Sequence, residues 1–244
     1  MEQDLNALVA KLKEAAGANL KSVVLYGSAV TGEFHSKHSD LNVLCLLERL
    51  DPAALEELNP PSRWWAGKGN PAPLVFTLEE LRRSADVFAI ELLDIKSSHR
   101  VLLGEDPFAQ LEVPMSLHHL QVERELRNNL VRLRQHYLSA PHDDKTSLGL
   151  MTGSVSSFIS LFRHALIALG QQSPAEPHQP KHTVVDRLAT LLRFDPSGFH
   201  TVLEVREDKK SSKQVNAPAV FRAYLEAVAR VVREVDERLN SSSH

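Results

Sequence analysis

The 244-residue chain has little cysteine and little net charge: one cysteine, Cys45, and a formal charge of −3. A single cysteine excludes an internal disulfide, as is usual in a reducing compartment, so we expect a cytoplasmic protein. The small negative charge argues against a strongly basic surface but leaves a local basic patch open, and nucleic acid is not an expected partner. No apolar run is as long as a membrane span, and the N-terminal segment lacks the charged-then-apolar order of a signal peptide. We therefore expect no membrane association.

The first half of the chain alternates helix and strand patterns. Apolar residues at helical spacing over 5–12 precede Gly17, the expected end of a first helix. Three β-rich runs are expected to form strands, at 23–26, 41–47 and 74–76. The alternation predicts an α/β (α+β) domain with a mixed sheet over residues 1–110.

Local signals assign the segments between these strands. Asp51-Pro52 is expected to open a short helix, because proline is favoured in the first turn. Segment 60–73 contains Trp64, Trp65 and several prolines and is expected to be a loop. Thr77 and Glu80 have the spacing of a capping box at a helix start. Residues 88–103 are expected to be extended, with an interruption near 97–98.

After Pro107 the apolar residues follow helical periodicity alone. Four amphipathic stripes occur, over 117–137, 148–169, 184–191 and 221–239. They predict an all-α antiparallel helical bundle over residues 111–244, and therefore a second domain.

The segment 22–47 carries the strongest chemical signal. An apolar strand ends in Gly27-Ser28, and eleven residues later Asp40 begins a second apolar strand that also holds Asn42. Glycine allows a ligand to approach the backbone closely, and exposed amides there attract anions. A carboxylate at the start of the next strand is a ligand for Mg²⁺ bound to a triphosphate. Since residues i and i+2 of a strand share a face, positions 40 and 42 are expected to point at one site.

These residues resemble the nucleotidyltransferase superfamily that includes DNA polymerase β and the aminoglycoside (kanamycin-type) nucleotidyltransferases. Its signature is a strand, Gly-Ser, about ten residues, and then Asp-x-Asp or Asp-x-Glu in a second strand. The segment 99–107 is similar to the one that closes such domains before a helical partner. The resemblance implies that Gly27, Ser28 and Asp40 bind the nucleotide and that Asp40 is a ligand of Mg²⁺. It also implies a third carboxylate on a later strand, acting as general base or metal ligand.

Glu91 and Asp94 are the candidates for that third carboxylate. Because they are three residues apart on an expected strand, only one of them should face the site, and Glu91 is slightly favoured. The predicted catalytic residues are thus Asp40, Asn42 and Glu91, and the predicted metal ligands are the same three with Asp94.

The departure at Asn42 leaves two functions open. An amide oxygen can bind Mg²⁺ but brings no negative charge, so loss of the second carboxylate weakens metal binding and transfer. One expectation is an enzyme, weak or inactive, that moves a nucleoside monophosphate from a nucleoside triphosphate to a hydroxyl acceptor, either a small molecule or a protein. The other is a non-catalytic, antitoxin-like regulator that uses the same fold to bind a nucleotide or a protein. The sequence does not decide whether the chain forms a homodimer.

Overall fold

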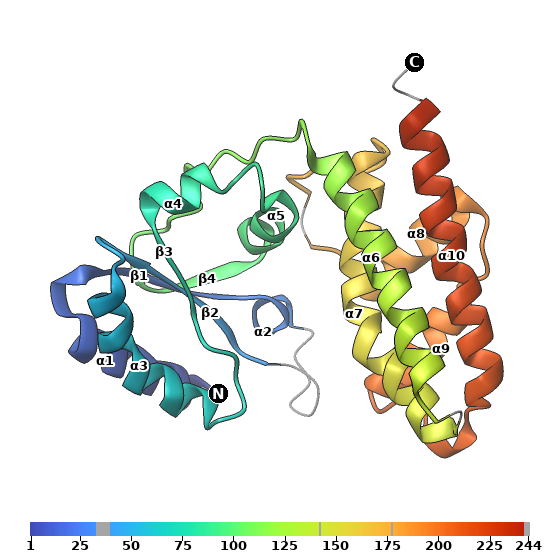
Figure 1. Cartoon of the computed structure of the whole chain (residues 1–244), viewed down its shortest axis with the longest axis horizontal. Helices are drawn as coiled ribbons and strands as arrows, with labels where there is room; N and C mark the ends of the chain where they lie inside the picture. Colours follow the sequence, from blue (N-terminus) through green and yellow to red (C-terminus); the bar gives the residue numbers. More distant parts are fainter. Residues whose placement is uncertain (33–39, 142, 177, 242–244) are drawn as a thin grey trace. The chain divides into compact units, whose positions relative to one another are not determined.

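The computed structural model describes residues 1–32, 40–141, 143–176 and 178–241, which form helices and strands in the order drawn in Figure 1. The chain divides into two compact units, Met1–Pro114 and Met115–His244. The first unit contains the β-sheet, and the second is helical.

Unit 1 is built on a four-stranded mixed sheet with the strand order β3-β2-β1-β4. Its strands are β1 (Leu20–Tyr26), β2 (Asn42–Leu47), β3 (Leu74–Thr77) and β4 (His99–Gly104). β1 is antiparallel to both β2 and β4, whereas β2 and β3 are parallel. The three runs predicted as strands are confirmed, and so is the mixed α/β class.

Helices cover both faces of this sheet (Figure 1). On one face, α1 (Glu2–Ala16) and α3 (Pro52–Ala66) pack on alternate residues of β1 and β2, including Val23, Cys45 and Leu47. On the other, α4 (Leu78–Arg83) and the helix α5 (Ala89–Ser97) lie in the cluster that contains Val24, Leu44 and Leu46. Burial on both faces explains why β1 and β2 are almost continuously apolar.

The prediction of a loop from residue 60 onward is wrong for its first part, because α3 continues through Pro60 and Pro61 to Ala66. Proline lacks the backbone N–H that an α-helix interior uses. Here the helix persists because its buried side, including Pro61 and the fully buried Trp65, packs in the core beside α1. Trp65 is therefore a core residue of unit 1. The predicted start is confirmed, since the Asp51 side chain accepts a hydrogen bond from the Ala54 amide at 2.8 Å.

The extended structure predicted for residues 88–103 is also wrong in its first half, because Ala89–Ser97 forms helix α5. Most residues of this helix are apolar and buried, so the segment has no clear polar face from which to read a period. Only the second half, β4, is extended. The predicted capping box at Thr77 is confirmed: its hydroxyl accepts from the Glu80 amide at 3.1 Å, and the Glu80 carboxylate accepts from the Thr77 amide at 2.9 Å.

Unit 2 contains α6 (His118–Ser139), α7 (Asp144–Ala168), α8 (Lys181–Leu192), α9 (Ser197–Arg206) and α10 (Ala217–Ser241). The four predicted helices are confirmed, and α9 was not predicted. Its sequence is short and carries the glycine Gly198, which is a poor helix former. At this glycine the helix approaches the backbone of Tyr224 on α10, where no larger residue fits.

Helix α7 is the central helix of unit 2 and contacts α6, α8, α9 and α10. By length and composition alone it could cross a membrane, but 61% of its most apolar 18-residue window is buried inside the protein. The core of a bundle explains its composition.

Candidate nucleotide-binding site

The turn between β1 and α2 (Ser28–Thr31) has a backbone that only glycine adopts readily. Gly27 has φ 81° and ψ −153°, outside the regions open to L-residues with a side chain. Its carbonyl accepts a hydrogen bond from the Val30 amide at 2.9 Å, which closes the first turn of α2. Gly32, with φ 78°, ends the helix. The predicted Gly27-Ser28 turn is thus a tight strand-to-helix connection in which residue 27 itself carries no side chain.

The side chain of Asn42 lies against this turn. Its amide nitrogen is 3.3 Å from the position that a Cβ on Gly27 would occupy. Asn42 is the first residue of β2 and pairs with Tyr26, the last residue of β1. The sequence motif therefore does bring Gly27 and Asn42 together.

A polar row crosses three strands beside the turn. Tyr26 pairs with Asn42 on β2 and with His99 on β4. Alternation along the strands places this row on the same face as Val24 and Leu44, which is the face covered by α5. Burial raises the pKa of Tyr26 to about 12, so its hydroxyl is neutral and is not a general base.

His99 fixes the end of α5 at this row. One ring nitrogen lies 3.0 Å from the Ile95 carbonyl of α5, and the other lies 3.0 Å from the Asp106 carboxylate. The ring also packs on Phe108, with centroids 4.9 Å apart. Neither Tyr26 nor His99 was singled out from the sequence, although both occur at strand ends next to the motif.

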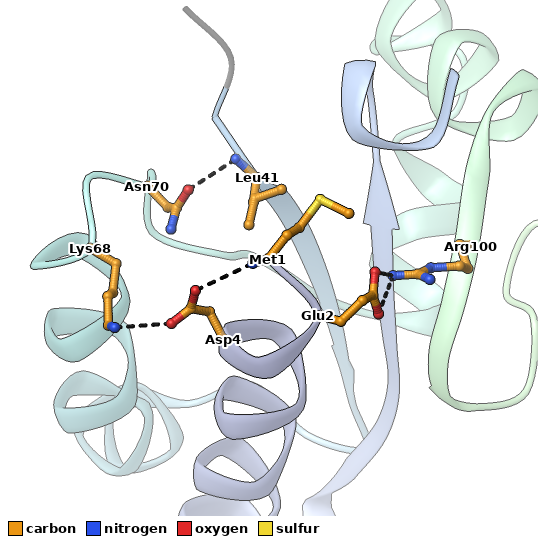
Figure 2. A network of polar contacts seen from close by, with 7 residues as sticks. All are labelled: Met1, Glu2, Asp4, Leu41, Lys68, Asn70 and Arg100. Atoms are coloured by element: carbon orange, nitrogen blue, oxygen red, sulfur yellow. Dashed lines mark hydrogen bonds and ion pairs between the residues drawn. The ribbon is translucent and has the colours of Figure 1, made fainter. Parts of the chain in front are cut away.

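Asp40 lies two residues before the start of β2 and is exposed. The residue after it, Leu41, is buried and donates its amide hydrogen to the side-chain oxygen of Asn70 at 3.0 Å (Figure 2). Asn70 thereby holds the chain at the start of β2. The structure does not place Asp40 on the strand itself, so the argument that positions 40 and 42 share a strand face does not apply.

Two ion pairs brace α1 near this segment (Figure 2). Asp4 lies 2.9 Å from Lys68 in the turn after α3, and hydrogen bonding to Lys68 is the main cause of its lowered pKa. Glu2 binds Arg100 on β4 through both carboxylate oxygens, at 2.9 and 3.1 Å. These pairs join α1 to the turn after α3 and to β4.

One solved structure with a related fold covers nearly the whole chain. It is the crystal structure of the spectinomycin adenyltransferase AAD(9) from Enterococcus faecialis with ATP and spectinomycin. The two chains superpose with a TM-score of 0.54 over 98% of this chain and 99% of the other, at 15% sequence identity. No protein-family model matches the chain, and no curated protein sequence matches it.

The chain has the two-domain nucleotidyltransferase fold of this structure. A mixed sheet followed by a helical unit, with Gly27-Ser28 at the end of β1, is the arrangement that the sequence resemblance implied.

Within this nucleotidyltransferase fold, Glu91 and Asp94 lie on helix α5, and not on a strand as predicted. Residues three apart on a helix lie on the same side, so the reason given for choosing only one of them is wrong. Glu91 is exposed and lies in the first turn, whereas Asp94 is half-buried and is followed by Ile95, whose carbonyl meets His99. Asp94 is therefore nearer along the helix to the end that His99 fixes.

Asp40 and Asn42 are the predicted ligands at this end of β2 that carry side-chain oxygens, and Mg²⁺ bound to a triphosphate takes only one or two protein oxygens and completes its shell with phosphates and water. Asp40 would supply the carboxylate, and Asn42 an amide oxygen. Among the residues that the structure describes, no three His, Cys, Asp or Glu side chains gather as they would around a metal ion. Among the described residues, the four predicted metal ligands therefore do not form a preformed cluster of this kind. Residues 33–39, which include His35, Lys37 and His38, lie outside the described part of the motif.

A cavity of about 910 Å³ opens at the other end of the sheet. It is lined by the start of β1 and the ends of β2 and β4, with Lys21, Glu48 and Arg82 among its charged residues. Lys21 and Glu48 already pair with each other at 2.8 Å. Its position away from Gly27 and its mixed charge set this cavity apart from the Gly27-Ser28 turn.

Proposed function

We propose that the chain binds a nucleoside triphosphate with Mg²⁺ at the Gly27-Ser28 turn and transfers its nucleoside monophosphate slowly to a hydroxyl group of a small molecule. The observation that carries the proposal is the junction of Gly27, Ser28 and Asn42 at the start of α2, in a fold that matches an adenyltransferase over 98% of the chain. That neighbour was crystallised with ATP and spectinomycin, which suggests the two substrate classes to test.

Each residue of the site has a defined part in this proposal. Gly27 leaves the backbone amides open to phosphate oxygens, and the Ser28 hydroxyl donates to one of them. Asp40 holds the Mg²⁺ that accompanies the triphosphate, which reduces the repulsion between the phosphates and the incoming oxygen. The oxygen of the acceptor hydroxyl forms a bond to the α-phosphorus while pyrophosphate leaves. Asp94 accepts the proton that this hydroxyl loses.

Asn42 makes the transfer slow. It is uncharged, and among the described residues no three His, Cys, Asp or Glu side chains gather as they would around a metal ion. A negative ligand at this position would bind a hard cation more strongly than an amide does. The same observation favours a second candidate, a regulator of the antitoxin-like kind that binds the nucleotide, or a protein, on this fold without turning the nucleotide over.

Calorimetric titration of Mg-ATP and the other Mg-nucleoside triphosphates tests the binding step. We expect the wild type to bind at least one of them and Asp40→Ala to bind it at least tenfold more weakly, a change of about 1.4 kcal/mol. Glu57→Ala is the matched control, because it removes an exposed carboxylate from α3, on the opposite face of the sheet from Asn42. No binding of any nucleotide by the wild type, or equal losses in both variants, would contradict the assignment.

Pyrophosphate release separates the two candidates. With spectinomycin and related hydroxyl compounds as acceptors, slow release by the wild type and faster release by Asn42→Asp indicate a nucleotidyltransferase. Binding without release in either protein, at any acceptor concentration, indicates the regulator.

A further inference from the structure

Two histidines of unit 2 face each other between α8 and α9. The Nδ1 atoms of His182 and His200 are 2.8 Å apart, and the rings are stacked with centroids 5.0 Å apart and an angle of 7° between their planes. The side chains are 34% and 26% exposed, so water reaches them. The short distance between Nδ1 atoms requires that one nitrogen carry a proton and that the other accept it.

The outer nitrogens of both rings meet carboxylates. His200 Nε2 lies 2.7 Å from Asp186, four residues after His182 on α8. His182 Nε2 lies 3.4 Å from Glu207 at the end of α9. Each helix thus supplies one histidine and one carboxylate, and each histidine contacts the carboxylate that the other helix supplies. Glu207 also binds Lys209 at 2.6 Å.

The hydrogen bonds of these four side chains determine how many protons the histidine pair holds. An ionised carboxylate only accepts, so both Nε2 atoms must carry a proton. With both outer protons in place, two neutral rings would turn two Nδ1 lone pairs toward each other, and two imidazolium rings would turn two N–H groups toward each other. Only one added proton, shared between the Nδ1 atoms, satisfies every contact.

Charged groups around the pair come from α8 and from the segments before and after α9. Burial alone would raise the pKa of Glu207, but Lys209 and His182 overcome this and lower it. Asp195, before α9, carries a pKa lowered mainly by the Ser197 amide and to a small extent by the charge of His200. Phe199 of α9 packs against aromatic side chains of α7 and α10, such as Tyr224. The other titratable side chains of these segments include His178, Lys181, Glu204 and Lys210.

We propose that Asp186, His200, His182 and Glu207 form a proton-dependent clamp between α8 and α9, closed when the histidine pair holds one proton and weakened when it holds none or two. The clamp ends at Lys209, the first lysine of the basic segment 209–213. Its opening removes the link that His182 makes to Glu207 at the end of α9, while Arg206 still binds the Thr152 carbonyl.

The sign of the pH effect follows from the protons bound in each state. Histidine ordinarily titrates near pH 6.5. About one unit above this, the unfolded chain binds fewer protons at these two residues than the closed clamp, so stability falls as pH rises. About one unit below it, the unfolded chain binds two protons and the clamp one, so stability falls as pH falls. The contribution of the clamp is greatest between these limits.

Thermal unfolding of the full chain from pH 5 to pH 9 tests the clamp, with wild type, His182→Gln and His200→Gln compared in EDTA. We expect the difference in Tm between the wild type and either variant to be about 2–4 °C larger near pH 6.5 than at either end of the range. His136→Gln, on the exposed surface of α6, is the control and should show no such maximum. A flat difference overturns the proposal, and so does a maximum that appears only when a divalent metal replaces EDTA.

A measurement on the wild type alone covers the case in which a variant does not fold. Imidazole ¹H–¹⁵N spectra near pH 6.5 should show both Nε2 atoms protonated and one proton exchanging between the two Nδ1 atoms. Two rings that titrate independently, each as an isolated histidine, would overturn the clamp.

Discussion

The amide nitrogen of Asn42 lies 3.3 Å from the point where a Cβ on Gly27 would stand. This contact joins the first residue of β2 to the turn that follows β1, and a Cβ on residue 27 would require the Asn42 side chain to shift by a few tenths of an ångström.

Replacing Gly27 by alanine should therefore destabilise unit 1 and abolish nucleotide binding. The backbone conformation at Gly27 costs a residue with a side chain about 1–3 kcal/mol, and the new methyl group also displaces Asn42. Urea unfolding and Mg-ATP calorimetry measure the two effects. Gly170→Ala is the control, because φ is 67° there and no atom lies within 4 Å of the added Cβ. It should lose stability and keep full nucleotide binding; loss of binding in both variants would mean that strain alone explains the result.

Gly198→Ala should destabilise unit 2. An added Cβ would lie 2.7 Å from the Tyr224 backbone nitrogen, so α9 and α10 must move apart. We expect a loss of at least about 1–3 kcal/mol, measured by denaturant unfolding. Gly153→Ala, at an exposed position on α7 with no atom within 4 Å, should instead stabilise the protein by about 0.4–1 kcal/mol. Equal effects of the two substitutions would contradict the close approach of α9 and α10.

Thr77→Ala should cost about 1 kcal/mol, because it leaves the Glu80 amide without its cap. Thr190→Ala removes a hydroxyl that only binds the Asp186 carbonyl within α8, and it should cost much less. The free energies of unfolding of the two variants give the comparison. The interpretation fails if Thr77→Ala is as mild as its control.

Cys45 should make stability fall at high pH. Burial raises the pKa of its thiol from 9.0 to about 12, so above about pH 9 the thiol ionises in the unfolded chain only. The wild type should then lose up to about 1.4 kcal/mol per pH unit relative to Cys45→Ala. Unfolding at pH 8 and pH 10 measures this difference. A constant difference between the two proteins would show that the thiol is accessible in the fold.

The sequence predicted the sheet and the location of the motif because the signals there are local. A β-rich run ending in Gly27-Ser28 needs a tight turn, and the capping box at Thr77 depends only on its own residues. Both features hold whatever packs around them, so both were read correctly.

The prediction failed where packing overrides local preference. Burial holds α3 helical through Pro60 and Pro61, and the apolar composition of α5 hid its period, which put Glu91 and Asp94 on a strand. The contacts of Asn70 with Leu41 and of Arg100 with Glu2 join segments that the sequence gives no reason to pair, because they lie 29 and 98 residues apart. Such contacts follow from the fold and become visible only with it.

The burial of α7 has a consequence for how unit 2 folds. By length and composition this helix of 25 residues could span a bilayer, and its buried side packs against four neighbouring helices. A partly unfolded chain in which α7 is uncovered therefore exposes a large apolar surface to other chains and to lipid. The helix that gives the bundle its core is therefore also the segment of unit 2 whose exposure during folding favours aggregation.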